Sequence, residues 1–75
     1  MDQKNLEINL KKYFQNQGFD LNVHQNLFES DALDSLGLFE LISYMSSELN
    51  IVIAQEKMTV ENFSSIEMIV KKFSN

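Results

Sequence analysis

The sequence predicts an all-α protein, a small bundle of three main helices plus one short helix. Three stretches of the chain carry apolar residues at helical spacing, each beside a residue that commonly begins or ends a helix. No stretch alternates apolar and polar residues long enough to predict a strand. There is no proline and there are only two glycines, so no segment has the composition of a linker. We therefore expect one domain covering residues 1–75.

The first helix is expected over residues 3–17. Its apolar stripe has four members: Leu6, Leu10, Tyr13 and Phe14. The stripe begins near Asp2 and stops before Gly18, which suits a helix C-terminus because glycine adopts positive φ without steric cost. From Phe19 to Asp34 the apolar residues are scattered, which predicts a long loop held against the core. A loop of that length is often functional.

The second helix has the clearest pattern. Asp34 offers an N-cap carboxylate, and Asn50 can end the helix. Five apolar residues share a stripe that is expected to face the core: Leu38, Leu41, Ile42, Met45 and Leu49. The polar residues opposite this stripe are Glu40, Ser43 and Ser47. Leu36 is the apolar exception among them, and it indicates either a contact surface or a single exposed leucine of the ordinary kind.

The remaining chain predicts a short helical turn and a last helix. The apolar run from Ile51 to Ile53 is too short for a strand. Thr59 can cap a short turn through Phe63, and Ser64 with Glu67 makes a capping box for the last helix. The apolar face of that helix has four members: Ile66, Ile69, Val70 and Phe73. Two lysines suit the negative end of its dipole: Lys71 and Lys72.

Composition and charge exclude several classes of function. The chain has no cysteine and one histidine, so neither a thiolate site nor an imidazole pair can bind a metal, and no metal site is expected. The net charge of -5 has the wrong sign for a nucleic-acid binder. Between Asp20 and Glu61 eight acidic residues face one lysine, a net charge of -7, while the flanks total +2. This acidic segment is expected to attract basic partners, or simply to keep the protein soluble.

The sequence also carries expectations about location. No apolar run approaches the length of a membrane span, so membrane insertion is not expected. The N-terminus lacks an apolar segment that could act as a secretion signal. We expect a cytoplasmic monomer. We also expect the chain to be folded, since 44% of its residues are hydrophobic.

Ser35 is the residue on which the functional interpretation depends. It follows the capping Asp34 and falls in the first turn of the second helix. A phosphodiester joined there would meet free backbone amides and the positive end of the helix dipole, which favour it even in an acidic neighbourhood. The tripeptide Asp34-Ser35-Leu36 is weak by itself, because three common residues often occur in this order by chance.

In context, this tripeptide resembles the motif of the acyl and peptidyl carrier protein family. The features that resemble it are Asp34-Ser35-Leu36 opening an amphipathic helix, Glu40-Leu41, the exit Leu49-Asn50-Ile51-Val52-Ile53, and Asn62-Phe63-Ser64-Ser65-Ile66 before the last helix. The resemblance covers about residues 27 to 73 and implies a helical bundle like that of the carriers. In that family the motif serine receives 4′-phosphopantetheine from coenzyme A, and the thiol of this arm holds the cargo as a thioester.

The resemblance implies a role for each matching residue. Ser35 would be the attachment site, and Asp34 would help to position the transferase and its magnesium ion. The implied partner-binding residues are Leu36, Phe39, Glu40 and Ser43. The implied partners are a phosphopantetheinyl transferase, an acyl- or aminoacyl-loading ligase or adenylation enzyme, and downstream enzymes that accept the acyl group. The chain itself is not expected to be an enzyme.

The chain departs from the family pattern in three places. Ala32 stands where many carriers have glycine and Ala54 where many have proline, and neither touches the attachment chemistry. The outward side of the second helix carries three serines where fatty-acid carriers are richer in acids: Ser43, Ser46 and Ser47. This favours a specialised pathway, such as aminoacyl, peptidyl or polyketide assembly or D-alanyl transfer, over fatty-acid synthesis.

Two other interpretations stay open. In one, Leu36 and Phe39 form the docking patch of a non-catalytic helical interaction module without a prosthetic group. The other is a small enzyme, which would need a proton-transfer group, and the sequence offers only His24 and scattered carboxylates. His24 lies in a polar stretch, which predicts a solvated surface side chain.

Overall fold

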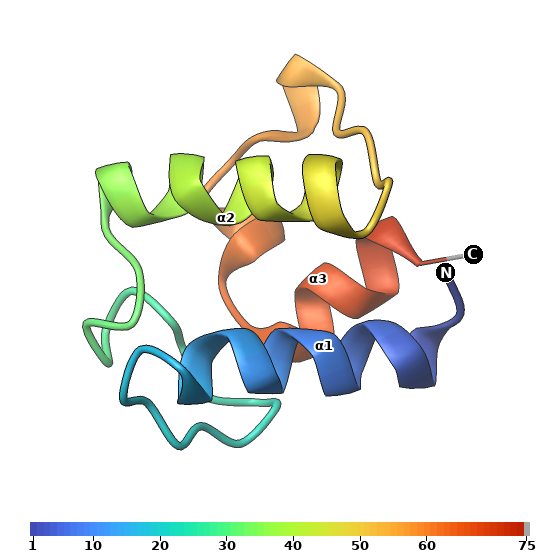
Figure 1. The fold of residues 1–75 in the computed structure, drawn as a ribbon. Helices are drawn as coiled ribbons and strands as arrows, with labels where there is room; N and C mark the ends of the chain where they lie inside the picture. The colour runs from blue at the N-terminus through green and yellow to red at the C-terminus, as the bar shows by residue number, and fades with distance from the viewer. Residues whose placement is uncertain (75) are drawn as a thin grey trace.

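The chain folds into three α-helices and two single turns of 3₁₀ helix (Figure 1). A computed structural model describes residues 1–74. In chain order the elements are α1 (Gln3–Gln15), α2 (Ser35–Glu48), η1 (Gln55–Lys57), η2 (Glu61–Phe63) and α3 (Ile66–Phe73). No strand occurs in these residues, so the all-α prediction is confirmed. Where a fourth, short helix was expected, residues 59–63 contain only the single 3₁₀ turn η2, so the four-helix part of the prediction is not confirmed; η1 was not predicted.

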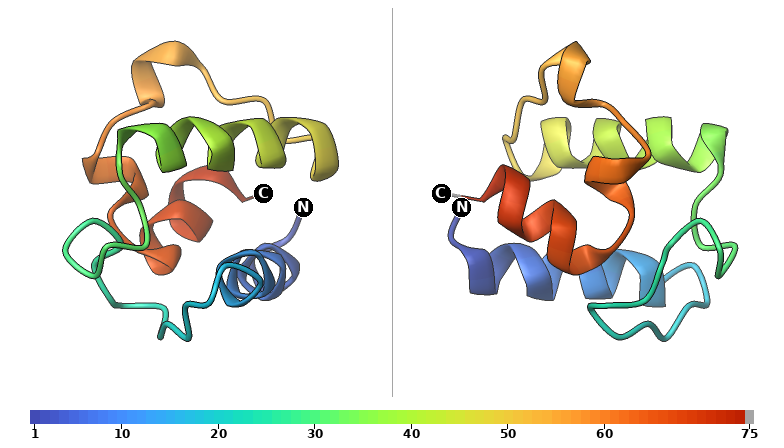
Figure 2. Two further views of the ribbon diagram at one scale, coloured as in Figure 1. Left: turned by 60° about the vertical axis from the view of Figure 1, so that its left-hand side comes forward. Right: turned by 180° about the vertical axis from the view of Figure 1, so that it is seen from behind.

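Helix α3 lies between α1 and α2 (Figure 1). In this view α1 and α2 run in opposite directions on the two sides of the molecule. The left panel of Figure 2 shows α1 nearly end-on while α2 lies across the view, so the two helices cross at an angle. Helix α1 packs directly against α3, and so does the turn η2.

The core draws on the inward faces of all three α-helices and on the loops between them. Its buried members are Leu6, Leu10, Phe14, Leu21, Leu27, Ala32, Leu33, Leu41, Met45, Ile53, Phe63, Ile66, Ile69 and Val70. No polar or charged side chain of residues 1–74 is buried among them. The fold is therefore stabilised by apolar burial rather than by an interior polar network.

Helix α1 has a capping residue at each end, Asp2 before it and Gly18 after it. The Asp2 side chain accepts a hydrogen bond from the Asn5 amide at 2.8 Å. At the other end Gly18 has a φ of +93°, and the amides of Gly18 and Phe19 donate to the carbonyls of Gln15 and Phe14. This pair of bonds is a Schellman motif, so the predicted glycine cap is confirmed, although the last regular turn ends two residues before the predicted boundary.

The loop from Phe19 to Asp34 is pinned to the core, as predicted. Three of its leucines are buried: Leu21, Leu27 and Leu33. Its backbone is also tied to the start of α3, because the Leu27 amide donates to the Ser64 carbonyl at 2.8 Å. The Leu33 amide in turn donates to the Leu27 carbonyl at 2.9 Å, which closes the last part of the loop and fixes the chain just ahead of α2.

Helix α2 follows the predicted pattern at both ends and on both faces. Within the predicted stripe Leu41 and Met45 are fully buried, and the other three members are half-buried against the core. The predicted polar residues on the opposite side are exposed. Asn50 has a φ of 57°, in the left-handed region that asparagine tolerates, and the Ile51 amide then donates to the Met45 carbonyl at 2.9 Å. The run after it forms no strand, and only Ile53 is buried.

The start of α3 corrects one prediction. Ser65, not Ser64, is the N-cap: its side chain accepts from the Met68 amide at 3.0 Å. Ser64 ends the preceding turn with helical dihedral angles, φ -71° and ψ -27°, so it cannot adopt the extended backbone of an N-cap. The capping box with Glu67 therefore does not form. The turn before it agrees with the prediction, since Thr59 Oγ1 accepts from the Asn62 amide at 3.2 Å.

Candidate functional site at the start of helix α2

Asp34 organises the first turn of α2. Its backbone is extended, with φ -133° and ψ -170°, while its carbonyl already accepts the first helical hydrogen bond, from Leu38. Its side-chain Oδ1 accepts from the Gly37 amide at 2.7 Å, which satisfies one of the free donors of the helix end. The predicted cap is confirmed. One oxygen of the carboxylate is thus committed to the helix, and the side chain stays exposed to solvent.

The lack of a side chain at Gly37 lets the Asp34 carboxylate approach the Gly37 amide closely. A Cβ added at Gly37 would lie 3.1 Å from Asp34 Oδ1 and 3.7 Å from the Leu33 side chain. A larger residue would therefore press on the capping carboxylate. Sequence reasoning missed this role. A signal was available, because glycine in a helix costs about 1 kcal/mol relative to alanine and its use in the first turn calls for a local reason.

Ser35 is the first residue of α2 and is exposed. Within the described residues its hydroxyl makes no hydrogen bond, and the amides of Ser35 and Leu36 have no backbone acceptor because they precede the first complete helical turn. The two amides lie at the positive end of the helix dipole. A negatively charged group on the Ser35 hydroxyl would consequently find donors nearby without displacing an existing bond.

The outer face of α2 brings together the residues predicted to bind partners. We use this term for Leu36, Phe39, Glu40 and Ser43. Their spacing of three and four residues places them on one side of the helix. All four are exposed, and the two large apolar side chains leave 70% (Leu36) and 64% (Phe39) of their surface accessible. The face therefore presents two neighbouring apolar side chains in solvent, directly beside Ser35.

The acidic residues of the middle segment stay in solvent. All eight carboxylates between Asp20 and Glu61 belong to exposed residues, so their charge acts on the surroundings rather than within the core. Two further apolar residues of this segment are exposed, Val52 at 86% and Val60 at 60%, and the sequence pattern did not indicate them. The surface of this part of the chain thus combines negative charge with isolated apolar side chains.

His24 does not belong to the start of α2. Its side chain is 70% exposed, as predicted for a surface histidine, and its Nδ1 lies 3.1 Å from Glu67 Oε1. The pair connects the long loop to α3, where the Glu67 amide also donates to the Val23 carbonyl at 2.9 Å. His24 therefore contacts α3, and in the described residues its side chain makes no hydrogen bond with Ser35 or with the other serines of α2. Among residues 1–74 no three potential metal ligands cluster together.

Tyr44 of α2 has a raised pKa. Its ring packs against Tyr13 of α1 with the ring centroids 4.6 Å apart. Partial burial raises the pKa of Tyr44 above 10.0, and the Glu48 carboxylate and Tyr13 add to the shift. This contact joins α2 to α1, and Tyr44 is not one of the four residues of the outer face.

Comparison with known proteins adds no identification. No protein-family model, no curated protein and no solved structure matches the chain. In the described part of the chain, no helix combines the length and apolarity needed to cross a membrane.

Proposed function

We propose that the protein is a carrier that holds an acyl or aminoacyl group as a thioester on a 4′-phosphopantetheine arm joined to Ser35. The observation that supports this most strongly is the free, exposed Ser35 hydroxyl on the first residue of α2, between the capping Asp34 and the exposed Leu36. It agrees with the resemblance of the Asp34-Ser35-Leu36 motif to that of the acyl and peptidyl carriers.

The surroundings of Ser35 fit the arm. The hydroxyl would become the oxygen that links the chain to the phosphate, replacing the adenosine bisphosphate part of coenzyme A. The free amides of Ser35 and Leu36 favour the negative charge of the resulting phosphodiester. When bound, the arm supplies the thiol, which the chain lacks because it has no cysteine. Ser35 and its two neighbours in sequence, Asp34 and Leu36, are exposed, so the arm can extend into solvent toward a partner enzyme.

Asp34 would serve both the fold and the attachment reaction. Its Oδ1 caps the helix through the Gly37 amide. Its other oxygen makes no contact with the helix amides and stays available to the transferase and its magnesium ion. In this proposal the chain supplies no acid or base to the reaction, so the partner enzymes perform the catalysis.

The outer face of α2 would be the surface that partner enzymes contact. Exposed Leu36 and Phe39 offer apolar anchors, and Glu40 adds a negative charge beside them. A complementary partner carries an apolar pocket with a basic rim. The transferase, the loading ligase or adenylation enzyme and the acceptor enzymes would all use this face. The serines at Ser43 and Ser46 favour aminoacyl, peptidyl, polyketide or D-alanyl pathways over fatty-acid synthesis.

A second candidate function is supported by the same exposed pair. Leu36 and Phe39 could form the docking patch of a helical interaction module that carries no prosthetic group, since exposed neighbouring apolar residues mark protein contacts. In that case Ser35 is only the first residue of a helix. The two functions differ in whether the Ser35 hydroxyl is needed.

Intact mass after incubation with coenzyme A and a broad-specificity phosphopantetheinyl transferase tests the proposal. We expect the parent protein to gain the mass of one phosphopantetheine and Ser35→Ala to gain none. Ser47→Ala, which removes another exposed hydroxyl of α2 outside the four residues of the outer face, is the matched control and should still be loaded. If folded, unmodified parent protein gains no mass with this transferase, the carrier proposal fails for that pairing and the docking module becomes the better account.

A further inference from the structure

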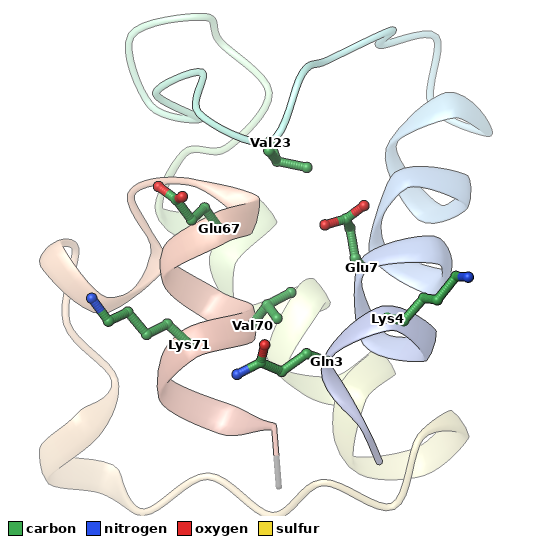
Figure 3. A pocket seen from close by; sticks show the side chains of 7 residues that line it. All are labelled: Gln3, Lys4, Glu7, Val23, Glu67, Val70 and Lys71. Carbon is green, nitrogen blue, oxygen red and sulfur yellow. The ribbon is translucent and has the colours of Figure 1, made fainter.

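A cleft opens on the side of the molecule between α1 and α3, beneath Val23 of the long loop (Figure 3). Its volume of about 560 Å³ is in the range of small-molecule sites. It is lined by Gln3, Lys4, Glu7, Val23, Glu67, Val70 and Lys71. None of these residues belongs to α2, so the cleft is separate from Ser35 and from the outer face of α2.

The inner wall of the cleft is apolar. Val70 of α3 is 8% exposed and forms part of the core, while Val23 contacts the core from the loop above. The two valines come from different elements and face the same space in Figure 3. A short hydrocarbon stem lying between them would remove apolar surface from water, which contributes about 0.8 kcal/mol for each buried methylene group.

One carboxylate at the centre of the cleft has no partner. Glu7 is half-buried, and its carboxylate extends from α1 into the space below Val23 (Figure 3). Within residues 1–74 it makes no ion pair, whereas the other lining carboxylate, Glu67, lies 3.1 Å from His24 Nδ1. The Gln3 side chain also makes no hydrogen bond in this part of the chain. The centre thus offers acceptors that nothing in the chain uses.

The positive charges of the cleft lie at its margins. In Figure 3 the Lys4 and Lys71 ammonium groups extend to opposite sides, away from the space between Glu7 and Val70. Backbone donors of α3 are not free either, because the Glu67 amide is bonded to the Val23 carbonyl. Beside Glu7 an anion would therefore meet a like charge, whereas a cation would be paired; the free donors of the cleft, the first amides of α1 at Gln3 and Lys4, lie at its edge one helix turn from Glu7.

We propose that this cleft binds an alkylammonium group, with the hydrocarbon stem against Val23 and Val70 and the charged nitrogen on Glu7. The ligand chemistry is a primary amine on a short apolar stem, supplied either by a free amine or by a lysine side chain of another protein. This site is independent of the carrier proposal, because none of its residues takes part in attachment at Ser35.

The test is a titration of the ¹⁵N-labelled protein followed by amide chemical shifts. The probes are n-butylamine and, for a protein side chain, Nα-acetyl-lysine amide; butyrate has a similar stem and the opposite charge. We expect the two amines to shift the amides of Val23 and Val70 and of residues beside Glu7, while butyrate does not. Binding by butylamine alone assigns the site to free amines, and tighter binding of the lysine derivative assigns it to a partner protein.

Three variants test which charged side chains of the cleft affect amine binding. Glu7→Gln keeps the shape of the side chain and should weaken amine binding about fivefold, as expected for a partly exposed ion pair. Lys71→Gln removes a repelling charge at the margin and should strengthen binding about twofold, an effect that disappears at high salt. Glu56→Gln in η1 lies outside the cleft and should change nothing. Equal shifts with butyrate, or unchanged affinity in Glu7→Gln, would overturn the proposal.

Discussion

The starts of helices α2 and α3 use the same local device in different surroundings. Each begins with a side-chain oxygen on the N-cap residue that accepts from an amide three residues later, at 2.7 Å for Asp34 and 3.0 Å for Ser65. At α3 the next residue, Ile66, is fully buried, and loop residues cover the helix end. At α2 the next two residues, Ser35 and Leu36, are exposed.

The two helix starts differ in which backbone amides and side chains are left without a partner. Two of the first three amides of α3 are bonded within the chain, since the Val23 carbonyl accepts from the Glu67 amide and the Ser65 hydroxyl accepts from the Met68 amide. At α2 only the Gly37 amide is capped, and the Ser35 hydroxyl is free. A helix start that is closed by tertiary contacts stabilises the fold, whereas an open one leaves a reactive group and free donors in solvent.

The largest expected effect on stability comes from truncating the residue after each helix start. Ile66→Ala should lower the free energy of unfolding by about 2–5 kcal/mol, because it leaves a cavity in the core. Leu36→Ala, of similar size but 70% exposed, should change it by less than about 0.5 kcal/mol. Denaturant unfolding of both variants measures the difference. Equal losses would mean that Leu36 is packed in the fold and not open for contact.

The caps themselves should contribute nearly equally. Ser65→Ala and Asp34→Ala each remove a side-chain acceptor, and each should cost about 1 kcal/mol. Asp34→Asn is the informative control, because asparagine caps a helix as well as aspartate does. We expect Asp34→Asn to keep the stability in denaturant unfolding while slowing phosphopantetheine loading. Normal loading would show that the charge of Asp34 has no part in attachment.

A pH-dependent effect should appear at the contact between α2 and α1. Since the pKa of Tyr44 is raised in the folded protein, its contribution to stability is complete below about pH 10 and is lost as the pH rises through the raised value. Tyr44→Phe should therefore reduce the loss of stability that sets in above about pH 10 as the pH is raised from about 9 to about 11. Thermal unfolding across this range measures it, and an unchanged pH profile in the variant would contradict it.

The smallest effect concerns the contact between the His24 and Glu67 side chains at the start of α3. His24→Ala removes the contact of His24 with Glu67, but both side chains are more than half exposed. An exposed pair contributes at most about 1 kcal/mol, and we expect less than about 0.5 kcal/mol in denaturant unfolding at neutral pH. The backbone bond between Glu67 and Val23 stays in place in this variant. A loss as large as that of Ile66→Ala would mean that the pair itself holds the loop to α3.

Most of the helical pattern could be predicted because it depends on neighbours in sequence. The Asp34 cap and the Gly18 terminus depend on residues within one or two turns, and both were confirmed. The cap of α3 was assigned to Ser64 instead of Ser65, since the two adjacent serines are chemically equivalent and only the geometry of the preceding turn decides between them. The turn η1 lacks a side-chain cap, so it left no signal in the sequence.

Some features of the candidate site could also be predicted from the sequence, and others could not. Ser35 and the outer face of α2 were predicted from helical spacing, and the structure places these residues together in solvent. The close fit of Gly37 against Asp34 was not predicted, because it depends on a distance between atoms. The cleft beneath Val23 was equally inaccessible to sequence reasoning, as its lining comes from α1, the loop and α3.

By itself the sequence determined the all-α fold class, the core stripes of the helices and the position of Ser35 at the start of α2. These properties follow from hydrophobic spacing and caps, which act over a few residues. Only the tertiary structure decided that the start of α3 is closed and the start of α2 is open. The physical reason is that coverage depends on residues distant in sequence: the loop at Val23 and Leu27 returns to α3, whereas Ser35 stays exposed among residues 1–74.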